Sequence, residues 1–317
     1  MDAALEHDKG AKKIGSTLKG IGPAYTDKIA RHGLRVDDIF SPNFTEKYQH
    51  LKQMHVQQMN SLGFDYQNHS IDGMPFADYE QQWIKSLEFV KQFDIIPCEY
   101  YLNEALNAGK RVLAEGAQGT LLDVDFGSYP FVTSSNTTVA GVCAGLGVAP
   151  SRIGKVYGIF KAYCTRVGNG PFPSELNDTI GDQLRKQGHE FGATTGRPRR
   201  CGWLDIPALQ YAVMLNGVTE LIVTKIDVMD NFSTIHICEH YMLNGKPTNQ
   251  FPMTEDFPLV TPIYKSFKGW QQPLNVASAY EQLPQALQDY VQYVESQMGI
   301  RVSMVSVGPD RVQTIYR

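Results

Sequence analysis

The chain has 317 residues, of which 42% are hydrophobic and 20% are charged, and its formal net charge is −4. This composition is typical of a globular protein with one large or two ordinary domains, and the acidic balance argues against a general nucleic-acid binder. No stretch is long and apolar enough to span a membrane, and residues 1–9 lack the apolar core of a signal peptide. The five cysteines include no C-x-x-C pair, which favours a reducing compartment. We therefore predict a cytoplasmic protein without a membrane or nucleic-acid partner.

The predicted elements change in character along the chain. Residues 43–108 are rich in Gln, Met, Tyr, Glu and Lys, and they predict several helices that form a helical insertion. From residue 109 onward, short apolar runs alternate with helical patterns, which is typical of α/β architecture. The predicted strands are 111–114, 155–162, 220–224, 234–241 and 301–305, and the predicted helices are 136–146, 178–187, 205–215 and 280–298. Residues 244–272, dense in Pro, Gly and aromatic residues, are expected to form a long excursion.

Two polar segments follow the first of these strands. In residues 115–120, two glycines flank Gln118, whose amide can donate and accept toward the N1–H/O6 edge of a hypoxanthine. Taken alone, a glycine-rich connector is the simpler interpretation. The hydroxyl-rich residues 133–138 precede a Gly- and Ala-rich helical pattern and predict either a helix cap or a phosphate site. Asp123 and Asp125 lie between these segments, and we expect them to be structural.

Residues 192–200 carry three arginines within four positions, Arg197, Arg199 and Arg200. A solvated basic loop is the ordinary meaning of such a run. The apolar neighbours Phe191 and Trp203 instead favour an embedded loop. Because guanidinium groups bind carboxylates and phosphates with two parallel hydrogen bonds, an embedded cluster predicts anionic ligands.

The pattern Thr-Lys-x-Asp ends the predicted strand 220–224 and contains Lys225 and Asp227. An Asp carboxylate there can accept from the N1–H and N2–H groups of guanine, whereas adenine would leave it unpaired. The predicted strand 301–305 ends in a turn that includes Gly308. Because ligands bind beyond the carboxyl ends of parallel strands, the two turns predict one base pocket, with backbone N–H groups facing guanine O6. The alternatives are a surface Lys-x-Asp and an ordinary turn.

Together these segments resemble adenylosuccinate synthetases. The resemblance extends over nearly the whole chain, through residues 14–25, 115–119, 129–138, 161–173, 192–203, 224–227 and 306–311. It implies a P-loop-NTPase-like fold, with a mostly parallel sheet flanked by helices, in a single domain over 1–317. Residues 1–108 would form its mainly helical part and 109–317 its nucleotide-binding part.

The resemblance also implies a homodimer and a reaction in two steps. GTP phosphorylates O6 of IMP, and the amine of L-aspartate then displaces that phosphate to give adenylosuccinate, GDP and phosphate. Mg²⁺ is the implied cofactor.

The resemblance further assigns residues to each ligand, with Gln118 as the candidate catalytic residue that orients the hypoxanthine edge. The implied IMP-binding residues are Thr17, Gln118, Thr133 and Arg197, together with Arg31, which would reach IMP in the partner subunit. The implied aspartate-binding residues are Ala193, Thr194, Thr195, Gly196, Arg197, Pro198 and Arg199. The implied GTP-binding residues are Arg199, Lys225, Ile226, Asp227, Ser306, Val307 and Gly308.

The chain departs from the family pattern in one amino-terminal loop. Leu18 stands where the family has a Gly, so we expect that the loop does not easily keep a positive φ. Lys19 replaces an Arg and keeps the charge but loses the planar fork. We therefore expect weaker binding of the IMP phosphate.

A larger departure is that the family's Gly-Asp-Glu-Gly-Lys-Gly phosphate loop and its later Gly-His segment do not occur in this sequence. We expect that an amino-terminal segment with the first strand, the phosphate loop, the catalytic Asp and His and the protein ligands of Mg²⁺ is missing. Turnover would then be unmeasurable, and a sheet edge would be exposed. The alternative to an active ligase is a non-catalytic module that keeps IMP binding, guanine binding and dimerisation. A GTP-binding regulatory protein ranks last, because it should have a phosphate loop.

Overall fold

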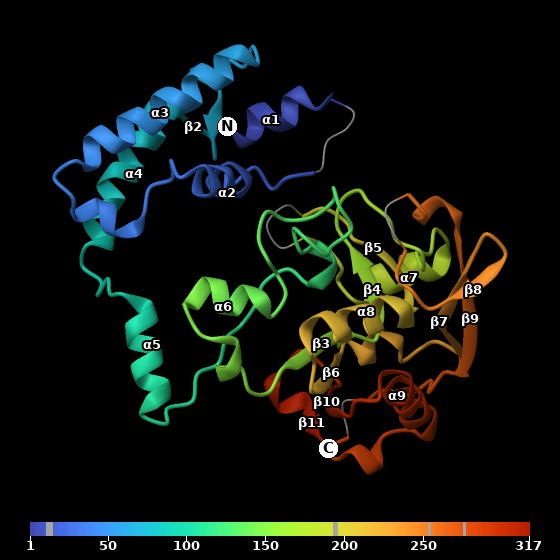
Figure 1. The fold of residues 1–317 in the computed structure, drawn as a ribbon. Helices are drawn as coiled ribbons and strands as arrows, with labels where there is room; N and C mark the ends of the chain where they lie inside the picture. Colours follow the sequence, from blue (N-terminus) through green and yellow to red (C-terminus); the bar gives the residue numbers. More distant parts are fainter. Residues whose placement is uncertain (11–14, 193–195, 253–254, 275–276) are drawn as a thin grey trace. The chain divides into compact units, whose positions relative to one another are not determined.

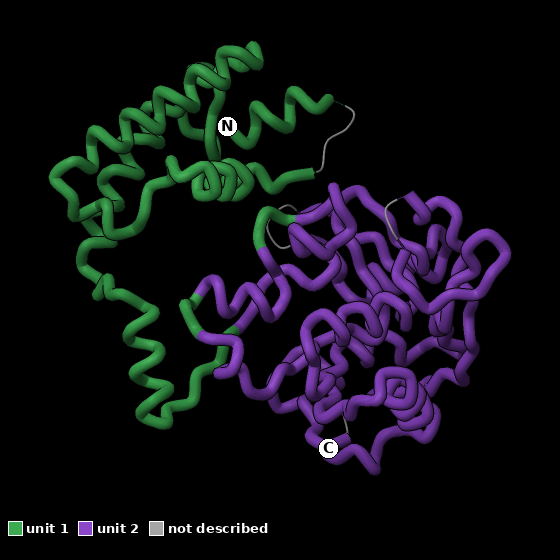
Figure 2. The backbone as a smooth tube through the Cα atoms, in the orientation of Figure 1, with its two compact units in different colours: residues 1–114, 133–135, 146–148 green, residues 115–132, 136–145, 149–317 purple. Residues whose placement is uncertain are grey.

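The computed structural model describes residues 1–10, 15–192, 196–252, 255–274 and 277–317. They form two compact units (Figure 2). The first unit contains residues 1–114, 133–135 and 146–148, and the second contains 115–132, 136–145 and 149–317. The main change of unit, after Ala114, lies close to the predicted boundary between helical and α/β parts. The prediction of a single domain stays a prediction.

The first unit is mainly helical, as the composition of residues 43–108 predicts (Figure 1). Its helices are α1 (Asp2–Asp8), α2 (Ile21–Ala30), α3 (Phe44–Ser61), α4 (Phe76–Val90) and α5 (Cys98–Asn107). Between α3 and α4, a hairpin joins β1 (Ser70–Ile71) to β2 (Met74–Pro75). Its two central residues, Asp72 and Gly73, both have positive φ angles, as a tight hairpin turn requires.

A four-stranded sheet carries the predicted base-reading residues of the second unit (Figure 1). Its strands are β3 (Tyr157–Lys161), β6 (Glu220–Thr224), β10 (Val302–Ser306) and β11 (Thr314–Tyr316). Strand β6 pairs in parallel with both β3 and β10, whereas β11 pairs antiparallel with β10. The carboxyl ends of β3, β6 and β10 therefore lie along one edge of the sheet.

A second sheet contains β4 (Tyr163–Arg166), β5 (Arg200–Asp205), β7 (Thr234–Leu243), β8 (Lys246–Thr248) and β9 (Val260–Lys268). Only β5 and β7 pair in parallel there; the other pairings are antiparallel. The prediction of a mostly parallel sheet therefore holds for the four-stranded sheet and is wrong for this second sheet. Strand β9 also lies within the segment that was expected to be an excursion.

A single residue, Ala162, joins β3 of the first sheet to β4 of the second. Its N–H donates to Thr224 O at 2.9 Å, and its carbonyl accepts from Tyr290 Oη at 2.7 Å. Ala162 is buried. Both polar groups of this corner are thus paired within the core, as buried backbone requires.

The predicted helices of the second unit are present, with two corrected starts. Helices α7 (Thr179–Gln187) and α8 (Ile206–Asn216) begin after the side-chain caps Asp178 and Asp205. Helix α9 (Gln285–Met298) begins after Pro284 rather than at residue 280, because a short 3-10 turn precedes that proline. Helix α6 (Ala140–Leu146) also begins later than predicted. None of the described helices is long and apolar enough to cross a bilayer.

The predicted strand 111–114 is wrong, because these residues have irregular structure and are exposed. No strand within the described part of the chain offers them backbone hydrogen bonds, and an unpaired segment has no reason to be a strand. Strand β3 lies at one end of its sheet, and its Ile159 side chain is 70% exposed. This edge shows apolar surface to the solvent.

Candidate functional site

The predicted base-reading turn follows β6 directly. Lys225 has a φ of 61°, a left-handed conformation that turns the chain sharply at the end of the strand. The Lys225 Nζ donates to Gly188 O at 2.8 Å, where Gly188 ends helix α7. The lysine stem therefore extends from the sheet edge to the end of that helix, where an ammonium is favourable. Ile226 is fully buried beneath the turn, and Asp227 is half-buried.

The second predicted wall of the base pocket, residues 306–308, lies at the same sheet edge. Val305 of β10 is the register partner of Val223 of β6, so both turns leave neighbouring strands at the same level. The Val307 N–H donates to Gln313 O at 2.9 Å, and Ser306 Oγ donates to Gly308 O at 2.9 Å. The expectation that this turn offers its N–H groups to guanine O6 is therefore wrong for Val307.

A local contact also explains why position 308 is a glycine. A Cβ at this position would collide with the side-chain amide of Gln313. The close approach that Gly308 permits is thus made by a neighbouring side chain of the chain itself. Asp310 closes the same turn, because its carboxylate accepts from Val312 N.

The arginine loop is closed at its base by paired backbone. Arg199 N donates to Glu190 O at 2.9 Å, Phe191 forms an antiparallel bridge with Pro198, and Gly192 N donates to Arg197 O at 2.8 Å. Gly196, near the loop tip, has a positive φ, and Arg197 is exposed. The predicted aspartate-binding residues Ala193, Thr194 and Thr195 lie outside the described residues.

Two of the three arginines are already paired with carboxylates of this chain. Arg199 Nη1 lies 2.6 Å from Glu190 Oε2. Arg200 pairs with Glu175 through two nitrogens and lies over the Phe172 ring. Arg199 and Arg200 therefore already have anionic partners within the chain, and the expectation of anionic ligands stays a prediction. The expectation of an embedded loop is only partly met. Phe191, which precedes the loop, is 47% exposed, and only the residues that follow the loop pack into the core.

Sequence reasoning missed Glu190, a carboxylate that is only 1% exposed. It accepts from Lys161 Nζ at 2.8 Å to both oxygens and from Tyr163 Oη at 2.6 Å, in addition to Arg199. Burial alone would raise the pKa of Glu190, but these donors hold it below its usual value. The available signal was a single acidic residue two positions before the arginine loop.

Lys161 at the end of β3 was also missed. Burial lowers the pKa of Lys161, the contact with Glu190 opposes this shift, and the nearby charges of Arg199 and Lys225 add to it. The end of the sheet therefore gathers three cations around one buried carboxylate.

The Gln118 segment forms a bend at the surface of the second unit. Gln118 is exposed and has a φ of 65°. The carbonyl of the next residue, Gly119, accepts from Thr137 Oγ1 at 2.7 Å. The predicted catalytic role of Gln118 stays a prediction.

Asp123 occupies two N–H groups of the predicted phosphate segment 133–138, those of Thr137 and Thr138. The fully buried Asp123 carboxylate accepts from Thr137 N at 2.6 Å and Thr138 N at 3.2 Å, and also from Asp125 N and Phe126 N. Burial would raise the pKa of Asp123, but the four N–H donors lower it. Asp123 is therefore structural, as predicted.

The amino-terminal loop keeps the positive φ that was thought difficult without glycine. Leu18 has a φ of 59° and is half exposed, so its side chain meets no steric obstacle. Its N–H donates to Ser16 Oγ at 3.1 Å, and that hydroxyl donates to Asp2. These polar contacts offset the strain of roughly 1–2 kcal/mol that a non-glycine residue has in this region. Lys19 pairs with Asp72 at 2.9 Å on the surface.

The remaining IMP candidates are divided between the units. Thr17 and Arg31 are exposed in the first unit, where Arg31 has a φ of 66° just after α2. Thr133 is half-buried and also belongs to the first unit, whereas Gln118 and Arg197 belong to the second.

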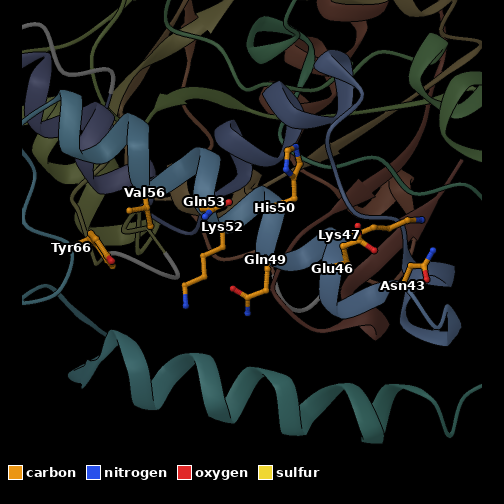
Figure 3. Close-up of a pocket in the computed structure, with 9 residues that line it drawn as sticks. All are labelled: Asn43, Glu46, Lys47, Gln49, His50, Lys52, Gln53, Val56 and Tyr66. Carbon is orange, nitrogen blue, oxygen red and sulfur yellow. The ribbon is translucent and has the colours of Figure 1, made fainter.

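A hollow of ≈ 790 Å³ lies along α3 (Figure 3). Polar side chains such as Gln49, His50 and Lys52 line it. Lys52 is engaged with Glu80, and no predicted site residue takes part in the lining. The hollow therefore lies apart from the chemistry that the sequence predicts.

The described residues include His, Cys, Asp and Glu side chains, which are the usual ligands of metal ions. Among them, no group of three or more His, Cys, Asp or Glu side chains is placed to hold a metal ion. The described residues therefore offer no all-protein cage for Mg²⁺, an ion that proteins commonly hold through one or two carboxylates and substrate phosphates.

Comparisons with known proteins give one consistent family. Residues 1–315 match the family described as adenylosuccinate synthetase. The adenylosuccinate synthetase of Cytophaga hutchinsonii is 51% identical over 318 residues, covering 100% of this chain and 72% of the relative. That of Porphyromonas gingivalis is 53% identical over 319 residues, covering 100% and 73%. The structure of fully ligated adenylosuccinate synthetase from Plasmodium falciparum has a TM-score of 0.89 and 34% identity, covering 100% of this chain and 74% of that chain.

These matches confirm the predicted family and a mixed α/β fold. They extend over the whole chain and over 72–74% of each relative, and the expectation of a missing amino-terminal segment is not supported by them.

Proposed function

Because the chain belongs to the adenylosuccinate synthetase family of purine-biosynthesis ligases, we propose that it joins IMP to L-aspartate with GTP as the phosphoryl donor. The observation that carries the guanine assignment is the turn after β6. It places a half-buried Asp227 beside the lysine stem of Lys225, at the edge where three parallel strands end. Ligands bind at such edges in α/β sheets.

In this proposal Asp227 accepts from N1–H and N2–H of guanine, and the Lys225 stem lies along the base. Arg199 approaches the phosphate or ribose of GTP. Ile226 and residues Ser306, Val307 and Gly308 complete the wall of the pocket. Asp227 rejects adenine because that base would leave its carboxylate unpaired.

The reaction would proceed by transfer of the GTP phosphoryl group to O6 of IMP, followed by displacement of phosphate by the aspartate amine. Arg197 would oppose an aspartate carboxylate, with the rest of the loop 193–199 around it. Gln118 would orient the hypoxanthine edge, with Thr17 and Thr133 at IMP and Arg31 reaching IMP of the partner subunit in a homodimer. Mg²⁺ would accompany the GTP phosphates and neutralise their charge; among the described residues, no group of three or more His, Cys, Asp or Glu side chains is placed to hold it.

The test is an assay with IMP, GTP, Mg²⁺ and aspartate that measures adenylosuccinate. Product that requires each of the three substrates, and that is lost when ATP replaces GTP, is the expected result. Equal product with ATP would contradict the role of Asp227.

A second candidate is a module that binds IMP and guanine nucleotide and dimerises without turnover. One observation favours it: within the described residues, no strand is followed by a glycine-rich loop that ends in Lys. Phosphoryl transfer relies on such backbone donors around the phosphates. Saturable binding of GDP and IMP without product would favour this candidate over the ligase.

A further inference from the structure

We infer that Glu190 is a positioning residue that holds Arg199 and Lys161 toward the nucleotide and thereby couples the arginine loop to the base-reading turn. The inference rests on the proposed guanine-nucleotide site. It concerns a buried carboxylate that would not itself touch the nucleotide.

The first step is that Glu190 fixes Arg199 at two points. The backbone N–H of Arg199 donates to Glu190 O at 2.9 Å, and its Nη1 donates to Glu190 Oε2 at 2.6 Å. Arg185 Nε donates to the Arg199 carbonyl at 2.7 Å. The direction of the guanidinium is thus set by contacts at both its backbone and its side chain.

The second step is that the same carboxylate reaches the sheet edge. Lys161 ends β3, and its register partner in β6 is Thr224, the residue immediately before Lys225. Lys161 Nζ donates to both Glu190 oxygens, and Lys225 Nζ donates to Gly188 O two residues earlier. Residues 188–190 therefore receive side chains from the base-reading turn, from β3 and from the arginine loop.

The third step is that the two cations are more exposed to solvent than the carboxylate that they share. The side chains of Lys161 and Arg199 are 26% and 29% exposed, whereas that of Glu190 is 1% exposed. The carboxylate lies behind the two cations, which keep part of their surface toward solvent. An anion that arrives from outside can therefore contact both cations without displacing Glu190.

The partners of Glu190 differ from those of the other buried carboxylates of the second unit. Asp123 accepts only backbone N–H groups within its own loop region, and Asp205 caps α8 and accepts from Tyr241 Oη. Neither pairs with a cation among the described residues. Glu190 alone in this set joins two cations from separate elements, and a structural role would not require them to be partly exposed.

The experiment is a double-mutant cycle on the full chain, with GDP binding measured by calorimetry. Glu190→Gln keeps the shape of the side chain but removes its charge, and we expect GDP affinity to fall about tenfold because Arg199 and Lys161 lose their common anchor. In an Arg199→Gln background, the same change should lower GDP affinity by a clearly smaller factor, since one of the two cations through which Glu190 acts is gone. The ratio of GDP to ADP affinity should stay as in the parent chain, because Asp227 is untouched.

Two further variants keep the test interpretable if Glu190→Gln does not fold, because removing one partner of a buried ion pair is strongly destabilising. Glu190→Asp keeps the charge but is one methylene shorter, and it should give an intermediate loss of GDP affinity that is again smaller in the Arg199→Gln background. Leu287→Ala, in the core away from the loop, should lower the unfolding midpoint without changing GDP affinity.

The outcomes separate the two proposals. No saturable GDP binding by the parent chain would overturn the proposed guanine site and this inference together. GDP binding by the parent chain that is unchanged in both Glu190 variants, or reduced by the same factor in both backgrounds, would overturn the inference alone.

Discussion

The two units of the molecule hold their candidate site residues by different means. In the second unit, Lys225 and Asp227 follow a strand whose apolar residues belong to one continuous core. In the first unit, the buried apolar side chains among the described residues are Ala4, Ile39, Met59 and Val148. There the loop with Thr17 is held by polar contacts to Asp2 and Glu6. The difference shows that strand register positions one set of residues, whereas local hydrogen bonds position the other.

The largest expected effect tests whether the cores differ in strength. Leu287 is fully buried in the second unit, so Leu287→Ala should lower its free energy of unfolding by about 2–5 kcal/mol. Met59→Ala in the first unit should cost less, because its surroundings are thinly packed and can collapse around the change. Hydrogen exchange resolved by peptide in denaturant would measure each unit separately. Equal losses would break the comparison.

Asp227→Asn sharpens the comparison at the site itself. The change replaces an acceptor by a donor, and it should weaken GDP binding by about 2–4 kcal/mol and favour xanthine nucleotides. Calorimetry with GDP and XDP measures both effects. Asp289→Asn, on the exposed face of α9, is the control and should leave both affinities unchanged. Unaltered GDP affinity in Asp227→Asn would remove the guanine assignment.

The units should also respond oppositely to pH. Burial raises the pKa of Asp205 to about 6, so the folded second unit holds this proton more tightly than the unfolded chain. Its contribution to stability is therefore fully present below the unfolded pKa of 3.8 and falls by about 3 kcal/mol in total as the pH rises through 6. Asp205→Asn should abolish that part of the pH profile.

In the first unit, burial would raise the pKa of Glu6, but hydrogen bonds from Gly15 N and Lys9 lower it. Its contribution is therefore present above the unfolded pKa and is lost as the pH falls through the folded value. Relative to Glu6→Gln, the parent chain should lose stability on acidification. Denaturant unfolding between pH 3 and pH 7 measures the free energy of unfolding of the parent chain and of both variants. Parallel pH profiles of the three chains would contradict the assignment.

The smallest effect concerns two non-glycine residues with nearly the same backbone conformation. Leu18→Gly should stabilise the first unit by less than about 1 kcal/mol, since it relieves left-handed strain at an exposed side chain. Lys225→Gly should give no such gain, because it also removes the hydrogen bond to Gly188 O. Thermal unfolding of both variants would show the contrast, and a stabilised Lys225→Gly would argue that the lysine contact contributes nothing.

The sequence was sufficient for elements whose pattern is local. Strand β6 and helices α7 and α8 were predicted to within a residue, because apolar runs and the caps Asp178 and Asp205 mark them directly. Strands β4, β5, β8, β9 and β11 were missed, because their stability comes from partners far along the chain. The predicted strand 111–114 is wrong because an apolar run that has no partner strand does not form a strand.

The candidate site was predictable only in part for the same reason. A Thr-Lys-x-Asp pattern is visible in a single stretch of sequence, and its position at a sheet edge follows from the preceding apolar run. The pairing of Glu190 with Lys161 joins residues separated by 29 positions. Nothing local to either residue indicates that they meet.

The corner at Ala162 has an evolutionary consequence. Lys161 and Tyr163 both reach Glu190, and Lys161 Nζ also donates to Thr165 Oγ1, because alternate residues of this nearly continuous segment face the same side. Substitutions at the outward positions leave that alternation intact. An insertion or deletion of one residue between β3 and β4 would turn Tyr163 away from Glu190 and bury a different set of side chains. We therefore expect homologous genes to vary here in residue type while keeping the length of the segment fixed.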